Sequence, residues 1–299
     1  MTRYGFLTAV LTISTILSGC TCPVDSTDRC PCASASSGKV EIYDDMARKK
    51  KIEQAAEVIM KSNKFTPLAT LIKQLARKQC SVRLPSPGNR TMTPAEIYSR
   101  YRSGVLVCGA PYKCTKCPRW HMGTATAFVL TDSGVLVTNH HVVNNKTGKA
   151  LVVMTYDGKA FPVMEVLAAN EADDIAIIRI EPKGVKLQPI PLWTDAPIGT
   201  PVSVIGHPKG RYYKLTTGVI SRYFNRIRGR TRTARVSITA DYARGSSGGP
   251  VIAPNGAAVG MVASTSNIYY QDKVDKNKQR LQMVIKECAT AANIRKLIR

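Results

Sequence analysis

Three short motifs contain the residue types that acyl transfer requires. Acyl transfer at neutral pH needs a hydroxyl nucleophile, an imidazole that takes its proton and a carboxylate that orients the imidazole. The motifs follow one another along the chain as Thr138-Asn139-His140-His141-Val142, Asp173-Asp174-Ile175 and Gly245-Ser246-Ser247-Gly248-Gly249-Pro250. Each motif alone also fits a loop or a solvated turn, but all three in this order predict a hydrolytic site.

The glycines around the serine pair indicate a backbone oxyanion hole. Two main-chain N–H groups stabilise an oxyanion only if a tight turn aims both at one point. Glycine adopts the backbone angles that such a turn demands. We therefore expect the amides of Gly245 and Ser247 to form the oxyanion hole.

The elements that must position these motifs are mainly strands. Beyond Gly104, short apolar runs alternate with turn signals such as Asp157-Gly158. Strands are expected at 123–131, 135–138, 151–156, 160–167, 174–180, 200–205, 213–224, 234–240, 257–264 and 281–286. Many short strands at this spacing are typical of a sandwich or a barrel. Residues 289–298 return to helical spacing.

The region before the strands is predicted to be helical. Residues 41–80 have apolar residues at helical spacing, and a second helix is expected to begin at Thr66-Pro67. Residues 85–89 are a breaker cluster, and Thr93-Pro94-Ala95-Glu96 predicts a capping box. The 41–80 segment fits a structural helical hairpin packed on the main domain, which we favour, or a partner-binding module.

From about Thr93 to Ile298, the chain resembles a trypsin-like (chymotrypsin-fold) serine endopeptidase, most closely the bacterial HtrA-type branch. The resemblance rests on the chain order histidine, aspartate, serine and on residues 123–130 and 134–143. It implies an all-β fold of two antiparallel six-stranded β-barrels, with the site in the cleft between them. It also implies protein or peptide substrates and a reaction without a cofactor or a metal.

The same resemblance assigns roles within each motif. It makes His141 the general base, Asp174 the orienting acid and Ser247 the nucleophile. The neighbouring Ser246 stands where such enzymes usually have Asp or Asn. No sequence follows residue 299 for a PDZ module, so peptide sensing of the HtrA kind is not expected.

The N-terminus predicts export and a lipid anchor. A short apolar run ends in Leu17-Ser18-Gly19-Cys20, which resembles the bacterial lipoprotein box and makes Cys20 the lipidation site. An ordinary secretory signal is the alternative. The predicted parts are a signal peptide at 1–19, a Cys/Ser-rich tether at 20–40, a helical segment at 41–90 and a peptidase domain at 91–299. The barrels are expected at about 104–192 and 198–288, followed by a C-terminal helix. This organisation predicts a protein of the bacterial cell envelope, anchored to a membrane.

The net charge of +23, from 43 basic and 20 acidic residues, favours anionic partners. Nucleic acid is not expected, because the chain is predicted to be exported. Even spacing predicts that an extended ribbon around Gly229 presents four guanidinium groups on one face. This ribbon either contacts anionic lipid or envelope polysaccharide, or is a solvated loop. Its arginines are Arg222, Arg226, Arg228, Arg230, Arg232 and Arg235.

A cysteine cluster lies just before the first barrel strands. Cys108, Cys114, Cys117 and His121 have the spacing of a Cys₃His zinc site. Export favours disulfides instead, with Cys22, Cys30, Cys32, Cys80 and Cys288 as further partners. Both alternatives stay open, and in either case the cluster is expected to be a structural staple.

Substrate specificity is predicted from two segments. Asp241 lies six residues before Ser247, where animal trypsin-like enzymes carry the acid at the base of the specificity pocket. A poorly solvated carboxylate there would favour cleavage after Lys or Arg. Alternatively, Asp241 caps the turn or pairs with Arg244. Ala263, Ser264 and Thr265 are expected to form the pocket wall and to pair with an extended substrate.

A second class of function is a catalytically silent envelope-binding or scaffold protein on the same fold. A decayed enzyme is expected to lose at least one residue of the catalytic set. Because His141, Asp174 and Ser247 are all present, the sequence favours the enzyme.

Overall fold

The computed structural model describes residues 40–115, 117–145, 147–271 and 279–299, and residues 43–299 form one compact unit. The predicted signal peptide, the lipidation site Cys20 and Cys22, Cys30 and Cys32 of the tether lie outside the described residues. None of the described helices is long and apolar enough to cross a membrane.

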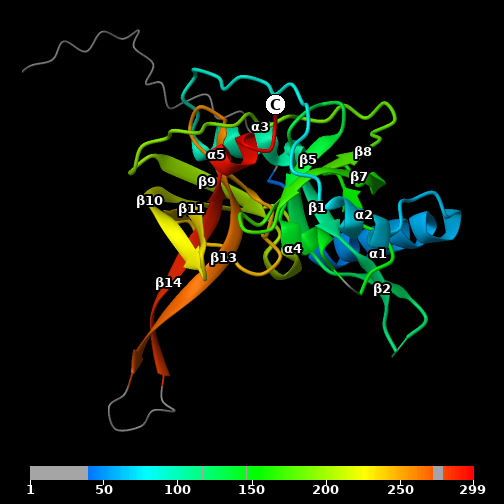
Figure 1. Cartoon of the computed structure of the whole chain (residues 1–299). Coiled ribbons are helices and arrows are strands. Elements are labelled where there is room, and N and C mark those ends of the chain that lie inside the picture. The colour runs from blue at the N-terminus through cyan, green and yellow to red at the C-terminus, as the bar shows by residue number, and fades with distance from the viewer. Residues whose placement is uncertain (1–39, 116, 146, 272–278) are drawn as a thin grey trace, which may run out of the picture. The chain divides into compact units, whose positions relative to one another are not determined.

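The first barrel is a closed sheet of six antiparallel strands (Figure 1). The strands follow the order β1-β4-β5-β8-β7-β6 around the barrel. Their bounds are β1 Val105–Gly109, β4 Ala125–Val129, β5 Val135–Thr138, β6 Val152–Met154, β7 Ala160–Asn170 and β8 Ile175–Ile180.

The strands of this barrel are buried on both faces, which explains their nearly continuous Val and Ile runs. Along β8, Ile175 and Ile177 belong to one apolar cluster, while Ala176 and Ile178 belong to another that includes Leu68 of a covering helix. Alternate side chains of a strand point to opposite faces of the sheet. One face of β8 therefore lines one core, and the other face packs under a helix.

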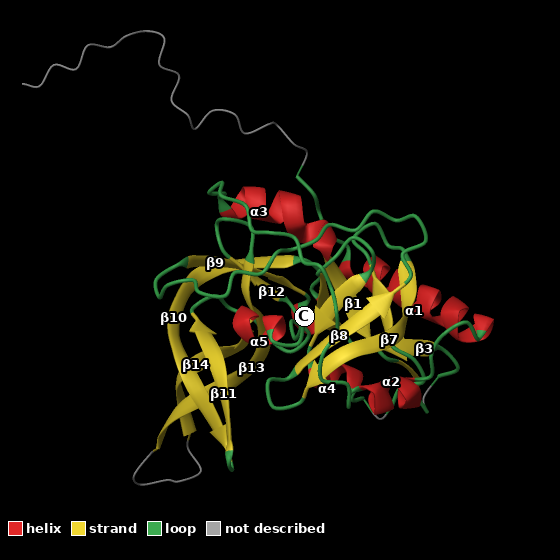
Figure 2. Cartoon of the chain, turned by 45° about the horizontal axis from the view of Figure 1, so that its top comes forward, coloured by secondary structure: helices red, strands yellow, loops and turns green. Residues whose placement is uncertain are grey.

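The second barrel closes in the order β10-β11-β14-β13-β12-β9 (Figure 2). Its strands are β9 Pro201–Gly206, β10 Lys214–Arg228, β11 Thr231–Ile238, β12 Pro250–Ile252, β13 Ala258–Gln271 and β14 Gln279–Thr290. Two closed six-stranded barrels confirm the predicted fold class. The hairpins β10–β11 and β13–β14 are longer than the expected strands at 213–224, 257–264 and 281–286.

The helices and one small hairpin pack around the barrels. The helices are α1 Asp45–Ser62, α2 Leu68–Gln74, α3 Pro94–Tyr101, α4 His140–Val143 and α5 Ala291–Arg295, with short 3₁₀ turns at Arg102–Gly104 and Pro208–Gly210. The predicted capping box is present, because Thr93 and Glu96 satisfy each other's main-chain N–H groups at the start of α3. The small hairpin consists of β2 Pro111–Lys113 and β3 Trp120–Met122.

The helical segment differs in detail from the prediction. α1 packs on β3 and β7, and α2 packs on β7 and α4. Thr66 does not cap α2, because its hydroxyl instead donates to the carbonyl oxygen of Met164 at 2.7 Å. Both helices cover the first barrel, which agrees with the structural interpretation of this segment.

The predicted arginine ribbon is only partly correct. The turn falls at Gly229, whose φ is +55°, but Arg232 pairs across the ladder with Ile227. Residues directly opposite in an antiparallel pair share a face, so Arg232 lies on the face opposite Arg226 and Arg228. Arg235 is 1% exposed and therefore does not contribute to a surface patch.

Candidate active site

The His141 side chain and the Asp174 carboxylate meet at one end of the first barrel. β5 and β8 are neighbours, with Thr138 opposite Ala176, so the residues that follow β5 and precede β8 lie side by side. The ring Nδ1 of His141 lies 2.9 and 3.0 Å from the two carboxylate oxygens of Asp174. The main-chain N–H of His141 also donates to Asp174 Oδ1 at 3.0 Å. This carboxylate can hold the imidazole in one orientation, with Nε2 left for a second partner.

The backbone around Asp174 is held in an unusual conformation. Its φ is +56°, in the left-handed region that aspartate tolerates better than most residues. The side-chain amide of Asn139 donates to the carbonyl oxygen of Asp174 at 2.9 Å. The segment just before α4 therefore fixes the turn that presents the carboxylate to His141.

The side chains of the adjacent residues His140 and Asp173 do not take part in the contact between His141 and Asp174. Asp173 accepts a hydrogen bond from Asn293 Nδ2 at 2.7 Å, and burial raises the pKa of its carboxyl. His140 is buried, and burial lowers the pKa of its ring. Of the two possible aspartates, Asp174 is the one that contacts His141.

The serine loop is attached to the first barrel through Thr126. The N–H of Thr126 donates to the carbonyl oxygen of Ser247 at 2.7 Å, and its hydroxyl donates to that of Gly245 at 2.9 Å. Gly245 has a φ of +103°, and a Cβ there would lie 2.4 Å from the carbonyl oxygen of His207. Only glycine fits this turn without a shift of the backbone.

The turn leaves two amides available for a ligand. In the described part of the chain, the N–H groups of Gly245 and Ser247 donate to no main-chain oxygen. No described hydrogen bond joins the Ser247 hydroxyl to the His141 ring. Hydrogen bonds of this kind are often loose without substrate and tighten when it binds.

Part of the chain is similar to a known protein family. Residues 125–261, which include His141, Asp174 and Ser247, match the family described as "Trypsin-like peptidase domain". Residues 125–261 are therefore similar to a trypsin-like peptidase domain.

Three relatives of the chain are all named as proteases. Protease Do-like 1 of Arabidopsis thaliana is 32% identical over 46% of this chain and 32% of its own length. A probable periplasmic serine endoprotease DegP-like of Chlamydia pneumoniae is 27% identical over 67% of this chain and 41% of its own length. The magnetosome formation protease MamE of Magnetospirillum gryphiswaldense is 33% identical over 68% of this chain and 26% of its own length. The chain thus spans less than half the length of each of these relatives.

A cavity of about 390 Å³ lies beside the His141–Asp174 pair of the peptidase domain. Arg226 and Arg235 of the β10–β11 hairpin line it, together with Ala263 and Ser264 of β13. Ala263 and Ser264, two of the three residues predicted to form the wall of the specificity pocket, therefore line the same cavity as His141. Thr265, the third, is exposed and lies in the ladder opposite Lys286.

Asp241 lines a cavity of about 230 Å³ with Tyr242 and Ser246, but its carboxylate is not the poorly solvated group that the predicted role requires. Its side chain is 84% exposed and lies 3.1 Å from Lys286 Nζ, so it pairs with this lysine and not with Arg244. The neighbouring Tyr242 is buried instead, and its hydroxyl donates to the carbonyl oxygens of Ser264 and Glu287 at 2.8 and 3.0 Å. A solvated, paired carboxylate gives little preference for a cationic substrate.

Arg235 is a residue of the site that the sequence pattern did not distinguish. Its guanidinium donates to the carbonyl oxygens of Ala172 and Asp173, both at 3.0 Å. These carbonyls belong to the turn that presents Asp174. Among the six arginines of the predicted ribbon, nothing in the local sequence marked this one as buried.

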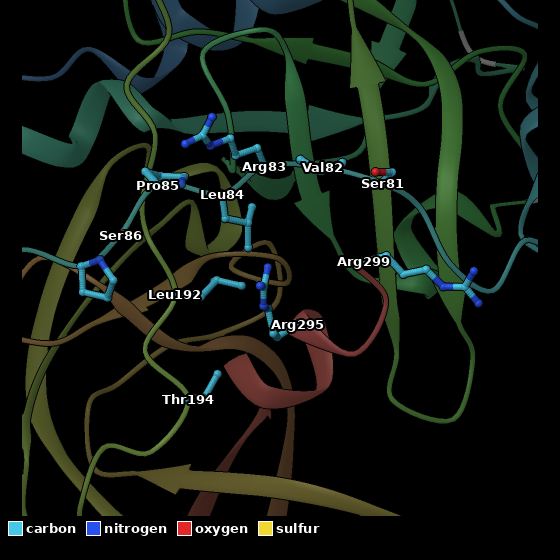
Figure 3. Close-up of a pocket in the computed structure, with 11 residues that line it drawn as sticks. Ser81, Val82, Arg83, Leu84, Pro85, Ser86, Leu192, Thr194, Arg295 and Arg299 are labelled. Atoms are coloured by element: carbon cyan, nitrogen blue, oxygen red, sulfur yellow. The ribbon is translucent and has the colours of Figure 1, made fainter.

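A larger cavity of about 580 Å³ lies elsewhere and contains none of the predicted site residues (Figure 3). It is lined by residues 81–87, Leu192, Thr194, Arg295 and Arg299. Arg295 of α5, Leu84 and Leu192 are among the labelled residues that line this cavity in Figure 3. The cavity is therefore separate from the candidate active site.

The predicted Cys₃His set is not brought together as a whole. Cys108 is fully buried in β1, while Cys114, Cys117 and His121 converge at the β2–β3 hairpin. Burial raises the pKa of Cys108 to about 12, which keeps it a neutral thiol. All five described cysteines, Cys80, Cys108, Cys114, Cys117 and Cys288, are free.

Proposed function

We propose that the chain is a serine endopeptidase that hydrolyses peptide bonds in proteins through an acyl-enzyme intermediate. The observation that carries the proposal is the pair of contacts between His141 Nδ1 and Asp174, at 2.9 and 3.0 Å. With Nδ1 facing the carboxylate, the ring nitrogen Nε2 is the one that can accept a proton. A general base in this state can activate the hydroxyl of Ser247.

In the first half of the proposed reaction, Ser247 Oγ attacks the carbonyl carbon of the substrate and its proton passes to His141 Nε2. The carbonyl oxygen becomes an oxyanion, which the amides of Gly245 and Ser247 stabilise. The carbon–nitrogen bond then breaks, and His141 returns the proton to the departing amine. Asp174 stays ionised and stabilises the imidazolium.

In the second half, water attacks the acyl-enzyme with His141 again acting as the base. The new carboxylic acid leaves, and Ser247 regains its proton. Ala263 and Ser264 support the binding of an extended peptide, because the pairing of β13 with β12 ends at Met261 and leaves the following residues of β13 without a described partner strand on that side. An unpaired stretch of strand can accept main-chain hydrogen bonds from a substrate.

Labelling with a fluorophosphonate probe tests the proposal. The probe is expected to label Ser247 in the wild type and in the Ser246→Ala variant. The Ser247→Ala variant should remain unlabelled. The matched control matters because the two serines are adjacent. A folded wild type that does not react would favour the catalytically silent scaffold. An adduct on Ser246 would overturn the assigned nucleophile.

We also propose that the protein resides in the bacterial cell envelope, anchored through a lipid on Cys20. The predicted lipoprotein box supports this, and a relative is named as periplasmic. Metabolic labelling with a radioactive fatty acid should mark the wild type but not Cys20→Ser. Incorporation into both proteins would contradict the anchor.

The tip of the β10–β11 hairpin is proposed to contact anionic lipid or envelope polysaccharide. Arg228 and Arg230 are exposed there, next to the 61% exposed Ile227. Charge attraction and a small apolar contact favour an anionic surface. Sedimentation with anionic vesicles, neutral vesicles and polysaccharide, using the wild type and an Arg228→Ser/Arg230→Ser double variant, tests this contact. Equal binding of both proteins to every partner would exclude it.

A further inference from the structure

The β2–β3 hairpin gathers three side chains that bind transition metals. It leaves the first barrel after β1 and returns at β4, and it packs against α1. Cys117 Sγ lies 3.4 Å from Cys114 Sγ and 3.0 Å from His121 Nε2. All three donor atoms lie within 4.8 Å of one another, and each residue is half-buried.

These separations fit one small metal ion. In a tetrahedral zinc site, bond lengths of about 2.3 Å to sulfur and 2.0–2.1 Å to nitrogen place neighbouring donor atoms roughly 3.5–3.8 Å apart. The hairpin therefore needs only small movements to surround the ion. Two thiolates and an imidazole form a donor set that suits zinc and is poorly suited to calcium or magnesium.

The other nitrogen of His121 has the partner that a metal-binding histidine usually has. Its Nδ1 lies 3.2 Å from Glu53 Oε1, and Glu53 belongs to α1. A carboxylate that accepts from Nδ1–H fixes the tautomer whose Nε2 lone pair is free for a metal. In this structure that Nε2 is the atom directed toward Cys117.

A Cys114–Cys117 disulfide accounts for less of this arrangement. The two sulfur atoms are 3.4 Å apart, whereas a disulfide requires about 2.05 Å. A disulfide would also not explain why His121 lies between the thiol of Cys117 and the carboxylate of Glu53. The convergence of four side chains from the hairpin and α1 is explained by an ion.

We propose that Cys114, Cys117 and His121 bind one Zn²⁺ ion, with Glu53 orienting the histidine and a water or another donor completing the coordination. The ion fastens the β2–β3 hairpin to α1. Because the hairpin leads directly into β4, which carries Thr126, this clamp stabilises the strand that holds the serine loop. The site is structural, and zinc binding can be measured whether or not the proposed peptidase activity is present.

Metal analysis of the full chain, purified without oxygen or chelator, tests the site. One zinc per chain is expected in the wild type and in Cys80→Ser, a control whose thiol lies elsewhere, beside the carbonyl oxygen of Leu297. Cys117→Ser and His121→Ala should lose the zinc, and Glu53→Gln should bind it about 10–100-fold more weakly. Retention of zinc by Cys117→Ser, or its absence from the wild type, would overturn the proposal.

Cobalt provides a measurement that does not depend on the folding of any variant. Wild-type protein stripped of zinc and loaded with Co²⁺ should show the visible absorption of a tetrahedral ion and a thiolate-to-metal charge-transfer band. Zinc should displace both signals. Octahedral cobalt without thiolate bands, or a Cys114–Cys117 disulfide in the anaerobic protein by mass spectrometry, would count against zinc at this site.

Discussion

The buried guanidinium of Arg235 donates a hydrogen bond to the carbonyl oxygen of Asp173 at 3.0 Å, one residue before the carboxylate that contacts His141. The same side chain also bonds the carbonyl oxygen of Ala172. A residue of the second barrel therefore holds the turn of the first barrel that presents Asp174. The relative placement of the proposed catalytic groups depends on this contact between barrels.

Replacement of Arg235 by methionine should reduce catalysis by mispositioning Asp174. We expect kcat to fall about 10–100-fold with little change in KM, because small displacements of catalytic groups have large effects on rate. The free energy of unfolding should fall by roughly 2–4 kcal/mol, because two buried carbonyls lose their partner. Steady-state kinetics with a peptide substrate, below the unfolding temperature, measures the first effect. Arg222→Met, an exposed position on β10, is the control, and an equal loss there would refute the positioning role.

The two adjacent aspartates should differ sharply when each is changed to asparagine. Asp174→Asn should keep the geometry but favour the wrong tautomer of His141, with a loss on the order of 10⁴ in rate. Asp173→Asn should leave the rate within a few fold, because its side chain faces Asn293. Measurement of kcat/KM for both variants shows which of the two aspartates orients His141. The opposite ranking would show that the acid is misassigned.

Specificity should not depend on Asp241. Its exposed carboxylate is paired with Lys286, so Asp241→Ala is expected to leave the preference at the cleaved bond unchanged. Profiling of a peptide library with the wild type, Asp241→Ala and the surface control Asp195→Ala measures this. A strong preference of the wild type for Lys or Arg that disappears only in Asp241→Ala would restore the prediction from the sequence.

Acid should destabilise the fold through His207. The ring is buried, and burial lowers its pKa to about 3, whereas in the unfolded chain it stays near 6.5. Between these values the unfolded state binds the extra proton, so stability falls as the pH falls from 6.5 toward 3. The contribution is about 1.4 kcal/mol for each pH unit within that window.

The test of this acid sensitivity uses His207→Asn. The asparagine oxygen can replace Nδ1 as the acceptor of the Tyr213 N–H, which lies at 3.1 Å, but it does not titrate. Denaturant unfolding at pH 7 and pH 4.5 should show a smaller loss of stability in the variant than in the wild type. Parallel losses in the two proteins would assign the acid sensitivity to other groups.

Local patterns were sufficient for much of the fold and for the choice of motifs. Apolar runs separated by turn residues predicted the barrel strands other than β1 and β12, and Thr93 with Glu96 predicted the start of α3, because these signals act over a few residues. They did not predict the full length of β13 and β14. The outer part of that hairpin exposes Ile268, Tyr269, Leu281 and Met283, so it lacks the alternation of a half-buried strand.

By itself the sequence determined the chemistry available: an imidazole, a carboxylate and a hydroxyl in a set order, and thiols with a histidine at metal-binding spacing. The resemblance to a family chose between adjacent residues of the same type, but only the tertiary structure shows which side chains are in contact and which are buried. Asp174 contacts His141 because β5 and β8 are neighbours, Cys108 lies in a barrel core, and Arg235 is buried under a turn 61 residues away in the chain, at Asp174. Side-chain type is local information, whereas burial and contact arise only when distant strands pair and close a barrel.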